Sequence, residues 1–294
     1  MTWTKNIFKK PKGLLFHYTT IDGLIGIFKD KKIWATSVSH LNDKKELAIA
    51  ADMFREAIAE LEPRLELPGE PALPPPGYEP DPRRKFLDAL RSFPDIAPES
   101  KTFVCSFSGE GDQLSQWRGY TTGGYGFSIG FDYSRLEKHV SRQKLLLAKC
   151  LYKPAMQREC IERFVKEEIE PQFRGLTADN TTRRMVESLV LLFHVLPVLK
   201  HASFKEEKEW RLISSLHSDR LIKLRAGRVT LIPYHEFELT DPNNKKETLP
   251  IGMIYVGPSP NSAESVIAIN ALLDQEGLSK SVEVRPSVIP YREI

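Results

Sequence analysis

The segment 204–213 places two carboxylates and an arginine on one face of a predicted strand. Read with a repeat of two residues, Glu207, Glu209 and Arg211 share this face. The opposite face carries apolar side chains, namely Phe204, Trp210 and Leu212. Carboxylates two residues apart on a strand lie about 7 Å from each other and repel unless a cation lies between them. We expect Arg211, a lysine such as Lys200, or a ligand to supply this positive charge.

The rest of the chain mixes short strand-like runs with segments of helical periodicity. Strands are predicted for residues 14–18, 33–37, 103–108, 127–132, 145–152, 221–224, 229–232, 251–256 and 282–284. Helices are predicted for residues 21–28, 44–61, 114–120, 159–173, 180–199 and 262–276. The two short runs at 221–232 are expected to form a hairpin. Together these elements predict an α+β fold with a central sheet flanked by helices.

Local signals mark the first two predicted helices. The threonines at 19–20 can cap the first helix, and Asn42 or Asp43 can cap the second. The apolar positions of the first helix are Ile21, Leu24, Ile25 and Phe28. Gly23 and Gly26 lower its intrinsic helix propensity, which indicates close packing against the sheet.

The chain length allows one large domain or two small ones. Of its 294 residues, 41% are hydrophobic and 28% charged, as in ordinary soluble globular proteins. Residues 63–82 are rich in proline and predict an exposed loop, part of an insertion at about 63–100. A helical insertion is expected at about 155–200. Because the segments on either side of the prolines are each too small to fold alone, we expect a single domain over residues 1–294.

Cysteine usage and hydropathy predict a cytoplasmic protein without a membrane segment. The three cysteines, an odd number without close spacing, fit neither a disulfide framework nor a zinc site. The N-terminus lacks the apolar core and cleavage pattern of a signal peptide. The most apolar run, at 189–199, is far too short to span a bilayer and predicts a buried helix.

The charge balance says little about partners. The net charge of +3 is a small difference between 42 basic and 39 acidic residues, so it is weak support for nucleic-acid binding. Basic clusters at 83–85 and 220–228 allow a nucleic-acid partner but are equally typical of a solvated surface. No metal site is expected, and the oligomeric state is not defined.

Several common catalytic motifs are absent from the sequence. It contains no GxGxxG, P-loop, HExxH or GxSxG pattern, and the glycine-rich residues 123–126 are interpreted as a turn. Cys105 as a nucleophile with His17 as its base is an alternative that no sequence pattern supports. His17 as a structural histidine, the glutamates as a solvated strand face, and Trp117 and Tyr120 as core aromatics are the simpler interpretations. However, these polar groups recur at predicted strand ends beside aromatic or glycine-rich chain, where ligand sites tend to form.

Taken together, the sequence blocks carry a resemblance to a known family. The blocks are residues 15–19, 33–37, 42–46, 105–108 and 117–120, then Lys200, Phe204, Glu207, Glu209, Trp210 and Arg211. In this order they resemble DUF2971, a bacterial and phage family of unknown function, from about residue 14 to residue 292. The proline-rich segment is an insertion relative to that pattern, and the family name implies no activity.

The first blocks also resemble another superfamily. A strand with His-Tyr-Thr, an amphipathic helix and a strand ending in Thr-Ser are similar to the ADP-ribosyltransferase superfamily of the DarT and diphtheria-toxin-like type. This resemblance implies a split central sheet, NAD as substrate, a ribose-binding role for His17 and a transition-state role for Glu209 or Glu207. It also implies an aromatic that stacks on nicotinamide, for which Trp117, Tyr120 or Tyr125 is available. The NAD-binding residues expected on this basis are His17, Tyr18, Thr19, Ser106, Trp117, Tyr120 and Arg211.

The sequence therefore leads to one hypothesis and two alternatives. The hypothesis is an NAD-dependent ADP-ribosyltransferase-like enzyme that modifies a nucleic acid or a host protein, as a toxin or phage-defence effector. In it, Glu209 and His17 act on NAD while Glu207 activates the acceptor. The alternatives are an NAD glycohydrolase or nuclease that uses the same pocket, and a non-catalytic ligand-binding module.

Overall fold

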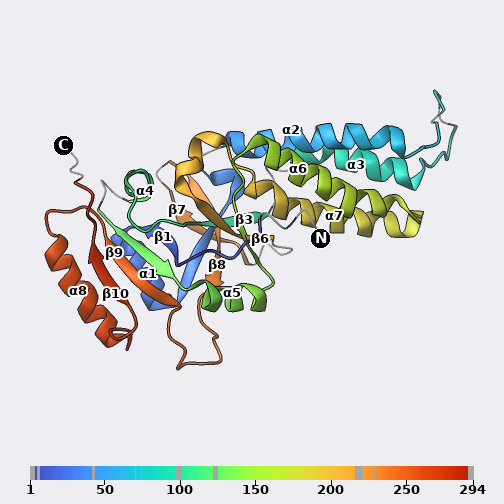
Figure 1. Cartoon of the computed structure of the whole chain (residues 1–294). Coiled ribbons are helices and arrows are strands. Elements are labelled where there is room, and N and C mark those ends of the chain that lie inside the picture. Colours follow the sequence, from blue (N-terminus) through green and yellow to red (C-terminus); the bar gives the residue numbers. More distant parts are fainter. Residues whose placement is uncertain are drawn as a thin grey trace.

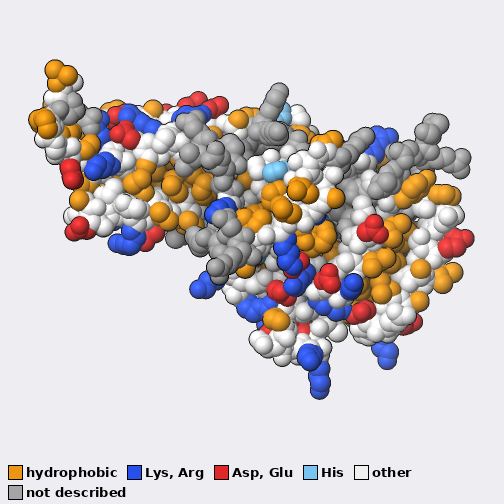
Figure 2. All heavy atoms as spheres, turned by 180° about the vertical axis from the view of Figure 1, so that it is seen from behind, with side chains coloured by type: hydrophobic (Ala, Val, Ile, Leu, Met, Phe, Trp, Pro, Cys, Tyr) orange, Lys and Arg blue, Asp and Glu red, His pale blue; other side chains and the backbone are white. Residues whose placement is uncertain are grey.

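A computed structural model of the chain describes residues 4, 7–41, 44–69, 71–73, 75–96, 101–121, 125–215, 221–227 and 229–290, without the side chains of 44–47, 94–96 and 215. The described elements form an α+β structure in which helices pack on a single mixed sheet, as predicted (Figure 1). No described helix combines the length and the apolar character needed to cross a bilayer. On the face seen in Figure 2, acidic and basic side chains are interspersed.

The strands are β1 (Leu15–Thr19), β2 (Lys32–Ser37), β3 (Thr102–Ser108), β4 (Phe127–Phe131), β5 (Leu146–Lys149), β6 (Glu209–Ser215), β7 (Lys223–Ala226), β8 (Leu231–Glu238), β9 (Ile251–Val256) and β10 (Glu283–Pro286). Their order is β10-β9-β4-β1-β3-β2-β8-β7, and β6 pairs with both β3 and β5. The β9–β10 pair is parallel, and the other pairs of these strands are antiparallel. β7 and β8 form the predicted hairpin.

The sheet divides at β3. One edge of β3 pairs with β6 over its whole length. The other edge is shared, because Ser108 pairs with Phe16 of β1 whereas Phe103 and Val104 pair with β2. Between these contacts, residues 105–107 have no strand partner on that edge among the described strands. β1 and β2 therefore diverge and leave a gap over the middle of β3.

The helices are α1 (Ile21–Asp30), α2 (Lys44–Leu61), α3 (Pro82–Ile96), α4 (Leu114–Tyr120), α5 (Tyr133–Arg142), α6 (Pro154–Phe164), α7 (Ala178–Val195) and α8 (Ser262–Gln275). α2, α3, α6 and α7 lie side by side and extend beyond the sheet (Figure 1). Their apolar residues share one core with Val104, Ala148 and Ile213 of the sheet. α1, α5 and α8 share a second core with alternate residues of the same strands, such as Cys105 and Leu212. Strand alternation thus supplies both cores.

α1 follows its predicted start but buries a slightly different stripe. The Thr20 hydroxyl caps the helix by accepting from the Gly23 backbone N–H at 3.2 Å. Its buried side chains are Leu24, Ile27 and Phe28, while Ile21 and Ile25 are exposed. A Cβ on Gly23 would lie 2.0 Å from the Thr19 Oγ1, so the predicted close packing holds there. Around Gly26 there is no atom within 4 Å of such a Cβ, so the same prediction is wrong at that position.

The structure corrects several of the elements predicted from the sequence. The strand predicted from residue 204 begins only at Glu209, because Ala202–Glu207 forms a 3-10 helix and Lys208 adopts a left-handed turn with φ of 46°. No helix was predicted after the proline-rich loop at 63–82, but α3 follows it, and its apolar side chains at 86, 87, 90 and 93 join the core of the helical layer. α5 was not predicted, since it buries few apolar residues, although Asp132 caps it by accepting from the Arg135 N–H. The cap predicted at Asn42 or Asp43 lies outside the described residues.

Candidate functional site

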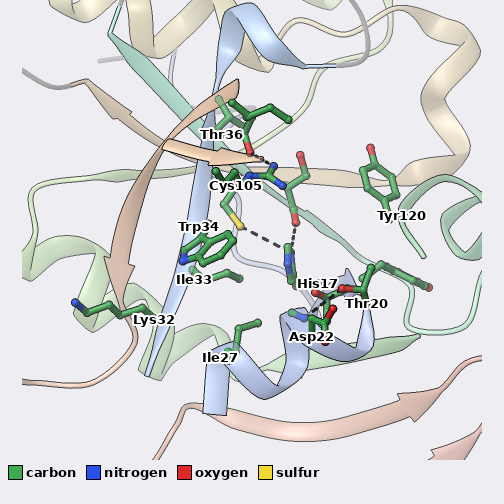
Figure 3. A pocket seen from close by; sticks show the side chains of 18 of the residues that line it. His17, Thr20, Asp22, Ile27, Lys32, Ile33, Trp34, Thr36, Cys105 and Tyr120 are labelled. Carbon is green, nitrogen blue, oxygen red and sulfur yellow. Dashed lines mark hydrogen bonds between the residues drawn. The ribbon is translucent and has the colours of Figure 1, made fainter. Parts of the chain in front are cut away.

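A cavity of about 470 Å³ opens where β1 and β2 diverge, and we refer to it as the sheet cavity (Figure 3). Its lining comes from β1, α1, β2, β3, α4 and the β7–β8 hairpin. The lining residues are Phe16, His17, Tyr18, Thr19, Thr20, Asp22, Gly23, Gly26, Ile27, Lys32, Ile33, Trp34, Thr36, His40, Val104, Cys105, Ser106, Gln116, Tyr120, Arg225 and Ile232. Of the predicted NAD-binding residues, this set includes His17, Tyr18, Thr19, Ser106 and Tyr120.

His17 lies at the centre of the sheet cavity. Its Nδ1 is 3.0 Å from the backbone carbonyl oxygen of Ser106, on the unpaired edge of β3. A carbonyl only accepts hydrogen bonds, so Nδ1 carries the proton and Nε2 of the neutral ring is the acceptor. Burial lowers the pKa of His17 against the effect of this hydrogen bond, which keeps the ring neutral near pH 7. The histidine thus replaces a missing strand partner and keeps one ring nitrogen available for a ligand.

Cys105 lies beside His17, with its Sγ 3.8 Å from Nδ1. The structure therefore brings together the cysteine and histidine that the sequence could not connect. However, the nearby Nδ1 donates to Ser106, so it is not available to take the thiol proton. Burial also raises the pKa of the Cys105 thiol well above its ordinary value. This arrangement favours a structural thiol over an activated nucleophile.

The aromatic wall of the sheet cavity comes from β1 and α4. The Tyr18 hydroxyl donates to the Glu110 carbonyl at 2.9 Å and accepts from the Gln113 N–H at 3.1 Å, which fixes α4 against β1. Trp117 packs edge-on against Tyr18, is 0% exposed and donates from Nε1 to Asp112. Trp117 is therefore a core residue and does not line the cavity. Tyr120, one helical turn further, lines the cavity and is 37% exposed.

The two glutamates and the arginine of the segment 204–213 form a buried ion network with a lysine. We define this ion network as Lys200, Glu207, Glu209 and Arg211. The Lys200 Nζ lies 2.7 Å from an oxygen of Glu207 and 2.6 Å from one of Glu209. The Arg211 Nε donates to the other Glu209 oxygen at 2.9 Å, and its Nη1 donates to the Pro197 carbonyl. Both cations proposed from the sequence are thus present. At 2% exposure, Glu209 is enclosed by its partners.

The two glutamates of the ion network differ in their pKa values and in their exposure. Burial alone would raise the pKa of Glu209, but the adjacent Arg211 and Lys200 outweigh it and hold the pKa at about 2. For Glu207, burial outweighs Lys200 and raises the pKa above its ordinary value. The Glu207 side chain is also the more accessible, with 14% exposure against 3% for Glu209. The pKa values of the two glutamates are therefore shifted in opposite directions.

The ion network adjoins the sheet cavity without lining it. Glu209 pairs with Ser108 of β3, and Ser108 pairs with Phe16 of β1, so these three side chains share one sheet face. His17, the next residue after Phe16, lies on the opposite face. Because the cavity lining includes His17 and not Glu209, the expectation that both face one cleft is wrong for this arrangement of side chains. Arg211 is likewise held in the ion network and not in the cavity lining.

Tyr120 links the two regions. It lines the sheet cavity, and burial together with the negative charges of Glu209 and Glu207 raises its pKa to about 12. The charges of both glutamates of the ion network thus act on a phenol of the cavity lining. The Ser108 hydroxyl also donates to the Glu207 carbonyl, and the Gln113 side chain donates to the Glu206 carbonyl. These bonds hold the 3-10 helix that carries Glu207 against the end of β3 and the start of α4.

Sequence reasoning missed the polar residues at the far end of the sheet cavity. Arg225 donates to the Thr36 hydroxyl at 3.1 Å, and its guanidinium lies 5.9 Å from the centre of the Trp34 ring. Trp34 is 44% exposed, and Lys32 lies on the same strand. The sequence offered only a basic cluster at 220–228 as a signal. Tyr125, a further candidate for stacking, does not line the cavity.

The structure thus defines an α+β protein with a polar and aromatic cavity at a sheet division. Residues 116–212 match the model of DUF2971, a family described as a protein of unknown function. The match confirms the resemblance to this family over a segment that contains Tyr120 and the whole ion network. No curated protein and no solved structure matches the chain. Among the described residues, no group of three or more His, Cys, Asp or Glu side chains is placed to hold a metal ion.

Proposed function

We propose that the protein is an NAD-using enzyme of the ADP-ribosyltransferase type, acting on a nucleic acid or a protein. The observation that carries the proposal is the sheet cavity itself: a cavity at a division of the sheet, with a first-strand histidine at its centre and a tyrosine at its edge. Such a cavity is large enough to enclose most of a ligand of several hundred daltons. The ADP-ribosyltransferase-like fold is part of this proposal.

His17 and Tyr120 are the NAD-binding residues in this proposal. The Nε2 of neutral His17 accepts a hydrogen bond from a ribose hydroxyl, while Nδ1 remains bound to Ser106. The exposed Tyr120 ring stacks on nicotinamide, whose ring is cationic in NAD and is attracted to an aromatic face. Trp117 has no part in stacking, because its ring is enclosed.

Glu207 is the residue that we assign to the acceptor. The reaction breaks the bond between nicotinamide and ribose, joins the ribose carbon to an acceptor oxygen or nitrogen, and releases the acceptor proton. Glu207 takes this proton, because its raised pKa makes it the stronger base of the two glutamates. Glu209 is a positioning residue, since it holds Lys200, which in turn holds Glu207.

The test is incubation of the protein with labelled NAD and with single-stranded DNA, duplex DNA, RNA or a protein extract. Free nicotinamide together with transfer of the label supports the proposal. Nicotinamide without transfer to any acceptor supports an NAD glycohydrolase. Intact NAD with every acceptor contradicts the proposal and leaves a binding module.

Variants assign the individual roles. Tyr120→Ala is expected to raise the KM for NAD, and Tyr120→Phe to retain the wild-type KM because the ring remains. Glu207→Gln is expected to retain NAD cleavage and lose transfer. Equal cleavage by wild type and His17→Ala would contradict the role of His17.

A further inference from the structure

Arg225 places a positively charged side chain in the lining of the sheet cavity. It pairs with Ile232 across the β7–β8 hairpin, and Tyr234 of β8 pairs with Thr36 of β2. By strand alternation, the side chains of Arg225, Trp34 and Thr36 share one sheet face. The single hydrogen bond of the Arg225 side chain to a described residue is the one to Thr36. Arg225 lines the sheet cavity, and its guanidinium lies 5.9 Å from the centre of the Trp34 ring.

The acidic side chains of β8, the strand that pairs with the strand of Arg225, already have lysine partners. Glu236 accepts from Lys32 at 3.0 Å and from Lys223 at 2.7 Å, and Lys32 also lies 3.3 Å from Glu238. Within the described part of the chain, Arg225 has no carboxylate partner. Its Nε is buried there without any hydrogen-bond partner. A buried N–H of a charged group without an acceptor is costly, so this position favours an anionic ligand.

The two ends of the sheet cavity carry side chains of opposite charge, Arg225 at one end and Asp22 at the other. Figure 3 shows Thr36, which binds Arg225, on one side of His17 and Asp22 on the other. An anion therefore gains at the Arg225 end and is repelled at the Asp22 end. The planar guanidinium can offer two parallel N–H groups to one phosphate, and the Trp34 ring lies 5.9 Å from it, within the range of a cation–π contact.

We propose that Arg225, Thr36 and Trp34 form a phosphate subsite that binds the diphosphate of a nucleotide in the sheet cavity. The subsite rests on the proposed function only in the choice of a nucleotide diphosphate as the ligand. It requires no bond to break, so it can be tested by binding alone.

The test is calorimetric binding of ADP and adenosine to wild type, Arg225→Gln, Arg225→Lys and Lys223→Gln. Lys223 is a matched control, because it lies on the same strand two residues away, pairs with Glu236 and does not line the cavity. Loss of Arg225 should weaken ADP binding by about 10- to 100-fold, as expected for charge-assisted hydrogen bonds to phosphate. Arg225→Lys should lie between wild type and Arg225→Gln, and adenosine binding should be the same in all four proteins.

Several results would overturn the subsite. They are no ADP binding by the wild type, equal ADP affinity in wild type and Arg225→Gln, or an equal loss in Lys223→Gln. Thermal melting of each variant confirms that the hairpin is folded.

NAD turnover separates this subsite from the proposed function. If ADP binding depends on Arg225 but the wild type leaves NAD intact, the phosphate subsite is supported and the proposed enzymatic function is contradicted. If Arg225→Gln cleaves NAD with the wild-type KM, the proposed enzymatic function is supported and the phosphate subsite is contradicted.

Discussion

The sheet cavity and the ion network are two polar regions on either side of β3, and they differ in how their polar groups are satisfied. In the ion network, each glutamate has a cation and Glu209 has two. In the sheet cavity, the acceptor nitrogen of His17 and the Nε of Arg225 have no partner among the described residues. Buried charges with partners are typical of a network that stabilises a fold, whereas buried polar atoms without partners are typical of a ligand site.

The Glu-x-Glu segment, Glu207 and Glu209, belongs to the ion network and not to the sheet cavity. Two close carboxylates suggested a catalytic pair, but Lys200 and Arg211 balance their charge. A network with no net charge exerts only a weak field on a cation in the adjacent cavity. The glutamate that differs is Glu207, which is less buried and has a raised pKa.

The largest expected effect concerns the ion network. Glu209→Ala removes the shared anion and leaves Lys200 and Arg211 buried with too few partners, which should lower the free energy of unfolding by about 3–5 kcal/mol. Glu207→Ala should cost less, because Lys200 retains Glu209. Urea unfolding of both variants checks this order. A smaller loss for Glu209→Ala than for Glu207→Ala would break the distinction between the two regions.

The pH dependence of stability sharpens the same distinction. Because the pKa of Glu209 is lowered from 4.5 to about 2, its stabilisation is present above pH 4.5 and is lost as pH falls toward 2, by up to about 3 kcal/mol. Glu207 has a raised pKa, so its contribution falls as pH rises above 4.5.

Urea unfolding between pH 3 and pH 7 measures these slopes. The stability difference between wild type and Glu209→Gln should shrink toward acid pH, while Glu207→Gln should gain relative to wild type at neutral pH. Parallel curves for both variants would contradict the assigned shifts.

At the edge of the sheet cavity, Gly23→Ala tests the start of α1. The new Cβ would collide with the Thr19 Oγ1, on a stiff β-branched side chain of β1, and should lower the free energy of unfolding by about 1–3 kcal/mol. Thermal or urea unfolding measures the loss. An unchanged stability would show that the contact between α1 and β1 is looser than described.

Gly26→Ala has the smallest expected effect, and it has the opposite sign. A Cβ there meets no atom, so alanine should raise the stability of α1 by about 0.5–1 kcal/mol. Gly26 also lines the sheet cavity, so the added methyl group should weaken binding of NAD or ADP. Higher stability with tighter or equal ligand binding would show that this part of the cavity is not used.

Helices and strands were predicted well where the local pattern of apolar residues determines them. The bounds of α2, α4 and β9 follow the predictions, and the alternation around Trp210 and Leu212 correctly placed these side chains in the core. β6 begins later than predicted because the left-handed turn at Lys208 interrupts the alternation.

The candidate site was less predictable because it depends on long-range strand pairing. The hydrogen bond between Thr36 and Arg225 joins residues 189 positions apart, and the gap beside His17 arises from the way in which β1 and β2 share β3. No periodicity in the sequence carries this information. For the same reason, the sequence could not show that His17 and Glu209 lie on opposite faces of the sheet.

We propose that NAD binds in the sheet cavity and not at the ion network. A crystal structure of the protein with NAD tests it most directly. We expect nicotinamide beside Tyr120, a ribose hydroxyl on the Nε2 of His17, the diphosphate on Arg225, and unchanged contacts from Lys200 to the two glutamates. NAD bound elsewhere, or a sheet cavity left empty at saturating NAD, would contradict it.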